Sequence, residues 1–106
     1  MLKSGNQALK PTVDLHGAFI RRVDLSDVSL RNANFVGTDA KNANFRNSDF
    51  EGARLDGMIL TGADLTGARN LTLEQLSTAV IDADTRLPDY IDRQKLLQFL
   101  SGFAHS

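Results

Sequence analysis

Residues 13–67 read VDLHG-AFIRR-VDLSD-VSLRN-ANFVG-TDAKN-ANFRN-SDFEG-ARLDG-MILTG-ADLTG, which is eleven consecutive groups of five. The third residue of each group, called the centre here, is large and apolar in ten of the eleven groups. The fifth residue is Gly, Asn or Asp in every group except the second, which ends in Arg22. A period of five fits neither a helix nor a long strand. It fits a chain that runs extended briefly, turns and repeats.

The pattern also predicts which side chains point inward. Alternate side chains of an extended segment share one face, so the first residue of each group and the centre should point together. A short side followed by a corner, repeated many times, winds a solenoid. We therefore predict an all-β solenoid whose interior holds these centres: Leu15, Ile20, Leu25, Leu30, Phe35, Ala40, Phe45, Phe50, Leu55, Leu60 and Leu65.

The groups resemble the repeats of the pentapeptide-repeat family, whose pattern is Ala-(Asp/Asn)-Leu-x-x. The resemblance implies a right-handed quadrilateral β-helix of about three coils, with four groups in each coil, so that residues twenty apart stack. In this register the middle coil has three phenylalanine centres and Ala40, and the first residues of its four groups are small or of modest size. Large centres beside small neighbours keep the volume of each coil similar, as a close-packed interior requires.

The chain divides into three parts by sequence. Residues 1–12 form a polar N-terminal arm, residues 13–72 form the β-helix, and residues 73–106 form a C-terminal helical cap. Thr72 with Gln75 matches a capping box and predicts a short helix over 71–80. Residues 81–88 should form an irregular or extended connector. A second helix should cover 89–102, with Asp89 as its cap.

Composition excludes several classes of protein. The chain has 106 residues, a formal charge of −1 and no cysteine. It has no transmembrane-length apolar run and no apolar signal core, so we expect a cytoplasmic protein, and the resemblance points to bacteria. Neither His16 nor His105 has a sequence partner for a triad or a metal site. We therefore predict no catalytic residue, cofactor or metal, and no direct binding to nucleic acid or membrane.

The favoured function is a non-enzymatic structural scaffold or protein–protein interaction module. The alternative, implied by the resemblance, is a DNA-mimic modulator of a type II topoisomerase (gyrase). A DNA mimic should be long and strongly negative, because DNA carries dense negative charge. Residues 13–67 carry eight acids and six bases, a net charge of −2.

The second side of the predicted solenoid is a candidate interaction face. Two apolar side chains would face water there beside three bases, in a set made of Phe19, Arg21, Arg22, Lys41 and Ile59. The face could dock an unknown protein partner. The alternative is that Phe19 and Ile59 lie under the N-terminal arm or a C-terminal helix.

The last predicted helix carries a broad apolar face, made of Leu96, Leu97, Phe99, Leu100 and Phe103. This face could pack on the last coil of the same chain, or it could pair two copies. Gyrase-inhibiting members of the family dimerise through their C-terminal ends, so the resemblance implies a homodimer through this helix.

Overall fold

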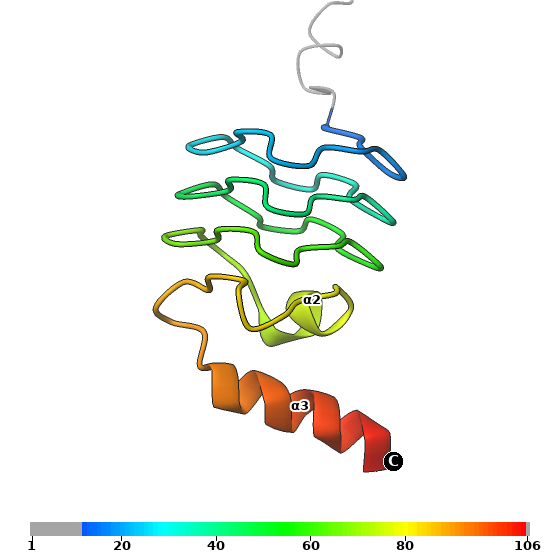
Figure 1. Ribbon diagram of the computed structural model, residues 1–106, viewed down its shortest axis with the longest axis vertical. Coiled ribbons are helices and arrows are strands. Elements are labelled where there is room, and N and C mark those ends of the chain that lie inside the picture. Colours follow the sequence, from blue (N-terminus) through cyan, green and yellow to red (C-terminus); the bar gives the residue numbers. More distant parts are fainter. Residues whose placement is uncertain (1–11, 106) are drawn as a thin grey trace, which may run out of the picture.

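The computed structural model describes residues 12–105, with side chains described as far as Ser101. The chain winds into stacked coils and ends in two helices, α2 (Leu73–Ser77) and α3 (Arg93–His105). Figure 1 shows the coils stacked along one axis, with α2 beneath the last coil and α3 beyond it. The predicted N-terminal arm, apart from Thr12, lies outside the described residues.

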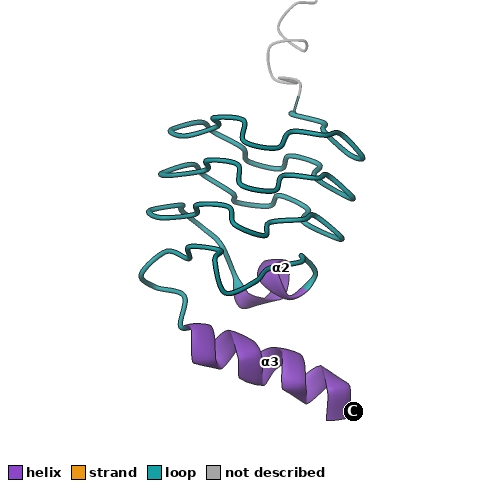
Figure 2. Cartoon of the chain, viewed as in Figure 1, coloured by secondary structure: helices purple, strands orange, loops and turns teal. Residues whose placement is uncertain are grey.

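Parallel bridges twenty residues apart join the first coil to the second. They pair Asp14 with Asn34, Phe19 with Asp39, Asp24 with Asn44, and Ser29 with Asp49. One turn therefore has four bridged sides, and the predicted stacking of residues twenty apart is confirmed. We number these sides face one to face four in chain order. Figure 2 draws the coils as loops, because each bridge is isolated and belongs to no longer strand.

The fifth residue of every group forms a corner. All eleven corner residues have a left-handed backbone, with φ between 59° and 72°. Glycine adopts this conformation freely, and Asn and Asp tolerate it. Arg22 adopts it too, with φ of 60°. For an ordinary side chain this conformation costs about 1–2 kcal/mol, so Arg22 is a strained corner.

Aromatic rings fill the middle coil. Phe35, Phe45 and Phe50 are fully buried, and their ring centroids lie 5.4–6.1 Å apart. Ala40 is the fourth centre of this coil and is also fully buried. Edge-on and tilted rings at this spacing add to the burial energy. The predicted filling of the middle coil is confirmed.

Two hydroxyl groups lie inside the core beside these rings. Thr38 Oγ1 donates to Leu15 O at 2.6 Å, and Ser48 Oγ donates to Leu25 O at 2.5 Å. Both side chains are fully buried. A buried hydroxyl without a partner is costly, so these bonds explain why polar residues are tolerated at inward positions.

The ladder continues after the repeats end. Ile59 pairs with Val80, and Asp64 pairs with Arg86. Residues 81–88, predicted to form an irregular or extended connector, contain one ladder position, Arg86, on face three. The spacings are 21 and 22 residues instead of twenty. One extra residue precedes Val80, in the part of the turn that contains α2, and the second lies between Val80 and Arg86.

The first C-terminal helix forms as its capping box predicts, although it is shorter. Thr72 Oγ1 accepts from Gln75 N at 3.0 Å, and Gln75 Oε1 accepts from Thr72 N at 2.9 Å. The capping box is therefore confirmed. Helix α2 covers only Leu73–Ser77 of the expected 71–80.

The predicted start of the second helix is wrong. Helix α3 begins at Arg93, and its cap is Asp92, whose Oδ1 accepts from the amides of Gln94 and Lys95. Asp89 does not cap it. The reason is a turn before the helix, in which Ile91 N donates to Pro88 O at 3.0 Å. Within the described residues, no helix is long and apolar enough to cross a membrane.

Candidate functional site

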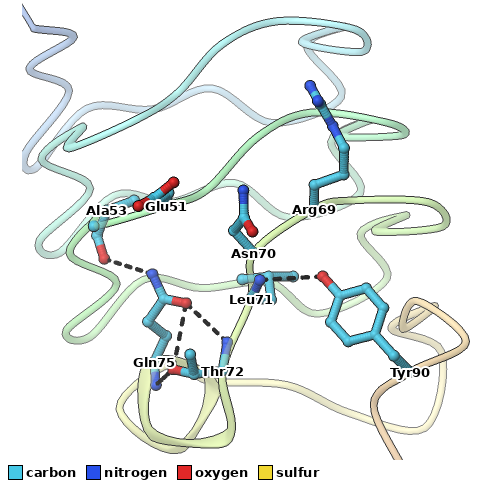
Figure 3. A pocket seen from close by; sticks show the side chains of 9 residues that line it. Glu51, Ala53, Arg69, Asn70, Leu71, Thr72, Gln75 and Tyr90 are labelled. Carbon is cyan, nitrogen blue, oxygen red and sulfur yellow. Dashed lines mark hydrogen bonds between the residues drawn. The ribbon is translucent and has the colours of Figure 1, made fainter.

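An open groove of about 890 Å³ lies where the last coil meets the C-terminal segment (Figure 3). No local pattern in the sequence predicts this groove. Its lining residues come from three separate stretches of the chain, and they are Glu51, Gly52, Ala53, Arg69, Asn70, Leu71, Thr72, Gln75 and Tyr90.

Tyr90 forms one wall of the groove and closes face four of the last coil. Its hydroxyl donates to Ala68 O at 2.5 Å and accepts from Leu71 N at 3.1 Å. On the preceding coil, the equivalent carbonyl of Ser48 accepts from the amide of Arg69. The phenol thus takes a place that a backbone amide fills one coil earlier.

Gln75 forms the opposite wall and closes face one. Its Nε2 donates to Phe50 O at 2.9 Å and to Ala53 O at 3.0 Å, while its Oε1 holds the start of α2. The polar groups of both walls are therefore committed to structural bonds. What remains at the rim is the exposed Arg69 and a carboxylate, Glu51, that is paired with Arg31 at 2.6 Å. This set does not pair a nucleophile with a base.

The histidine on the repeats makes only a local contact. His16 Nδ1 lies 2.7 Å from Asp14 Oδ1, with both side chains exposed. This side-chain hydrogen bond lowers the pKa of Asp14 below its ordinary value. Among the residues that the structure describes, no group of three or more His, Asp or Glu side chains could hold a metal ion. The side chain of His105 lies outside those described.

Face two carries a column of outward side chains that is apolar at three of its four levels. Successive bridges stack Phe19, Asp39, Ile59 and Val80 on this face. Phe19 is 82% exposed and Val80 is 48% exposed, while Ile59 is half-buried. No described segment covers Phe19. The repeat pattern predicts Phe19 and Ile59 on this face but not Val80, because Val80 follows the repeats at a spacing of 21 residues.

The charge of this face is smaller than the sequence suggests. Arg21 Nε donates to Asp39 Oδ2 at 2.8 Å, so one of the three predicted bases is neutralised. Burial acts to raise the pKa of Asp39, but hydrogen bonds from Arg21 and the Lys41 amide lower it overall. Arg22 and Lys41 have no acidic partner within the described chain. Face two thus combines an apolar column with two unpaired cations at one corner.

The residues predicted for self-association do not share one exposed face. Leu96 is fully buried in the core of its own chain, so its assignment to such a face is wrong. Leu97 is 57% exposed, whereas Phe99 and Leu100 are half-buried. The side chain of Phe103 is not among those described. Helix α3 packs on its own chain through Leu96 because Leu76 and Ile91 offer an apolar surface beneath the last coil.

The four-sided register, the left-handed corners and the stacked centres define a β-helical scaffold. The sequence pattern of pentapeptide repeats matches residues 13–47 and 41–69, with eight copies. The chain belongs to the pentapeptide-repeat family. Members of this family form right-handed quadrilateral β-helices, and this chain has that fold.

One solved structure of another member agrees with this fold. A pentapeptide-repeat protein from the cyanobacterium Cyanothece 51142 is 28% identical, with a TM-score of 0.63 over 73% of this chain and 52% of that one. This chain therefore spans about half the length of that protein. No protein of curated function matches the sequence significantly.

Two further solved structures are more distant. A pentapeptide-repeat protein from the thylakoid lumen of Arabidopsis thaliana is 21% identical, with a TM-score of 0.39 over 80% of this chain and 70% of that one. QnrB1, a plasmid-mediated fluoroquinolone resistance protein, is 22% identical, with a TM-score of 0.42 over 83% of this chain and 44% of that one.

Proposed function

We propose that this chain is a non-enzymatic scaffold that binds a protein partner through face two. The observation that carries the proposal is the exposure of Phe19, at 82%, on a column that also holds Ile59 and Val80. A large aromatic side chain left in water is typical of an interface, where its burial contributes much of the binding energy.

The ladder gives this face a rigid geometry. Two backbone hydrogen bonds flank Phe19. The amide of Ile20 donates to Asp39 O at 2.8 Å, and the amide of Asp39 donates to Ala18 O at 2.8 Å. Backbone bonds on both sides of the column fix the spacing of its outward side chains. A fixed surface loses little conformational entropy on binding, which favours affinity.

Substitution on two faces of the same coil tests this function. Phe19→Glu should abolish capture of the partner by cross-linked pull-down from the native cell, because it places a charge at the centre of the contact. Ser29→Glu is the matched control, since Ser29 holds the same ladder position on face four. Capture of the same proteins by wild type and by the Phe19→Glu variant would contradict the proposal.

We propose that the chain has two functional parts, a β-helix of about three coils at 13–72 and a helical segment at 73–106 that caps it.

Self-association through α3 is a second proposed contact, supported by the exposure of Leu97 at 57%. Light scattering on wild type and Leu97→Glu tests it. Equal masses at all concentrations would argue against a homodimer through this helix.

The alternative function, imitation of DNA, gains little support from the surface. The outward column on face three runs Asp24, Asn44, Asp64 and Arg86. A neutral residue separates its two acids, and a basic residue ends it. Asp64 is also paired with Arg46 at 3.1 Å. A gyrase supercoiling assay tests this alternative, and inhibition at low micromolar protein would favour it.

We also propose that the protein is located in the cytoplasm of a bacterium, which fractionation of the native cell checks.

A further inference from the structure

Face two can be complementary to itself. Its column has four levels, counted from the N-terminus, occupied by Phe19, Asp39, Ile59 and Val80. A two-fold axis that crosses the column between the second and third levels turns the column end for end. Phe19 of one copy then meets Val80 of the other, and the same contact repeats by symmetry. The two most exposed apolar side chains of the column would cover each other.

The neighbouring corner is complementary in charge. Arg22 forms the first level of this corner, Gly62 forms the third, and Asp82 forms the fourth, where its carboxylate accepts from the Gly62 amide at 3.1 Å. The same two-fold axis keeps this corner on the same side of the contact while reversing its levels. Arg22 of one copy is therefore brought to Asp82 of the other, which gives two opposite-charge pairs across the contact.

Neither member of this charge pair has an oppositely charged partner in the described chain, although Asp82 Oδ1 also accepts from the amides of Asp84 and Thr85. Arg22 is exposed, has no acidic partner in the described chain, and holds a left-handed corner that Gly, Asn or Asp fills at the other ten. Strained residues of this kind collect at functional sites. Asp82 is also exposed, and hydrogen bonds led by that from the Gly62 amide lower its pKa, so the carboxylate is ionised at neutral pH.

The other face-to-face arrangement fits less well. A two-fold axis parallel to the column would keep every level unchanged and set Asp39 against Asp39. Each Asp39 carboxylate is already paired with Arg21 of its own chain, so this level gains no opposite-charge partner. The exchange of corners places Arg22 opposite the Gly17 corner and away from Asp82, so the two charge pairs of the antiparallel contact are lost.

We propose that the occupant of face two is a second copy of this chain, packed antiparallel so that Phe19 covers Val80 and Arg22 pairs with Asp82. This inference rests on the proposed function of face two. Levels about 4.8 Å apart make the column only about 15 Å long. Stable interfaces bury about 800 Å² on each partner, so this dimer should be weak and depend on concentration.

Engineered disulfides test the arrangement, because the chain has no cysteine of its own. Phe19→Cys and Val80→Cys variants are mixed in equal amounts and oxidised mildly. The antiparallel contact predicts that a mixed disulfide between positions 19 and 80 forms several-fold faster than either homodisulfide. Ser29→Cys mixed with Val80→Cys is the control, since Ser29 lies on another face at the same level as Phe19. Adding Arg22→Glu to the Phe19→Cys variant should reduce the mixed product several-fold at low salt.

Each other result overturns the inference. A predominance of the Phe19→Cys homodisulfide would show a parallel contact, and a yield no higher than the Ser29 control would show no self-contact. A thiol at position 19 that resists a soluble thiol reagent would show that the chain's own residues cover this face. If cross-linking fails while Phe19→Glu still abolishes capture of another protein, the proposed function stands and only the second copy is wrong.

Discussion

The two ends of the β-helix differ in how the backbone edge and the core are closed. At the N-terminal end, within residues 12–105, no hydrogen bond reaches the amides of Asp14, Phe19, Asp24 and Ser29. The centres of this first coil, apart from Leu30, are only half-buried. At the C-terminal end, the last coil makes hydrogen bonds to the following segment on all four faces, and its centres are fully buried or nearly so.

The C-terminal end uses two different means of closure. On faces two and three, Val80 and Arg86 continue the ladder with backbone bonds to the last coil. On faces one and four, the side chains of Gln75 and Tyr90 bind the open carbonyls of Ala53 and Ala68 instead. An amide or a phenol can present the same donor as a peptide group. A β-helix can therefore stop repeating without leaving its last coil unpaired.

The first test of this contrast compares buried centres along the axis. Phe45→Ala in the middle coil should lower the free energy of unfolding by about 3–5 kcal/mol, because a fully buried ring leaves a cavity. Leu15→Ala in the first coil should cost about 1 kcal/mol, since a half-buried leucine has less transfer energy to lose. Urea unfolding of both variants measures the difference. Equal losses would mean that the centres of the first coil are as well enclosed as those of the middle coil.

A second test removes one side-chain closure. Tyr90→Phe keeps the ring and deletes the hydroxyl that joins Ala68 O to Leu71 N. Leaving these backbone groups without a partner should cost about 1–3 kcal/mol. Hydrogen exchange at the Leu71 amide should rise more than at the Phe45 amide, whose partner Asp64 O lies inside the ladder. A uniform rise at both amides would show global destabilisation and not a local opening of the groove.

Much of the fold could be predicted from the sequence, because the repeat encodes it locally. The period of five places the corner at a fixed residue, and alternation places Phe35, Phe45 and Phe50 inside. Capping residues are also local signals, so Thr72 and Gln75 were recognised. Asp89 was not a correct cap, because the turn from Pro88 to Ile91 delays the helix.

The parts that could not be predicted depend on contacts between distant residues. Tyr90 lies 22 residues after Ala68, and nothing near either residue indicates that the phenol will close the last coil. The position of Val80 on face two could not be predicted, because the segment that contains α2 lengthens the spacing from twenty to 21 residues. Leu96 looked like part of an exposed apolar stripe, since helix periodicity cannot say which neighbour covers the stripe. The groove beside Tyr90 was missed for the same reason.

A third test uses acid to probe the link between the middle coil and the C-terminal end. The side chain of Asn70, the amide of Glu51 and the side chain of Arg31 all donate to Asp49, and together they lower its pKa below the ordinary value of about 3.8. A carboxyl with a lowered folded-state pKa stabilises the fold above its unfolded pKa. That stability is lost as the pH falls through the folded value.

Asp49→Asn should therefore lower the urea midpoint at about pH 6 and reduce the further loss of stability seen as the pH falls below about 5. Asp56→Asn is the control, because the Asp56 side chain is exposed and makes no hydrogen bond within the described chain. If both variants keep the wild-type dependence on pH, Asp49 does not couple the middle coil to Asn70.

The smallest expected effect concerns the N-terminal coil and has the opposite sign. Arg22→Asn should raise the free energy of unfolding by up to about 1 kcal/mol, because Asn tolerates the left-handed backbone that strains Arg22. The same variant should weaken cross-linking between copies through Phe19 and Val80, since it removes a cation opposite Asp82. Thermal unfolding of dilute protein measures the first effect, and disulfide yield at high concentration measures the second. A more stable monomer that associates less would mean that Arg22 destabilises the monomer and stabilises the contact between copies. Unchanged association would leave the strained corner without a role on face two.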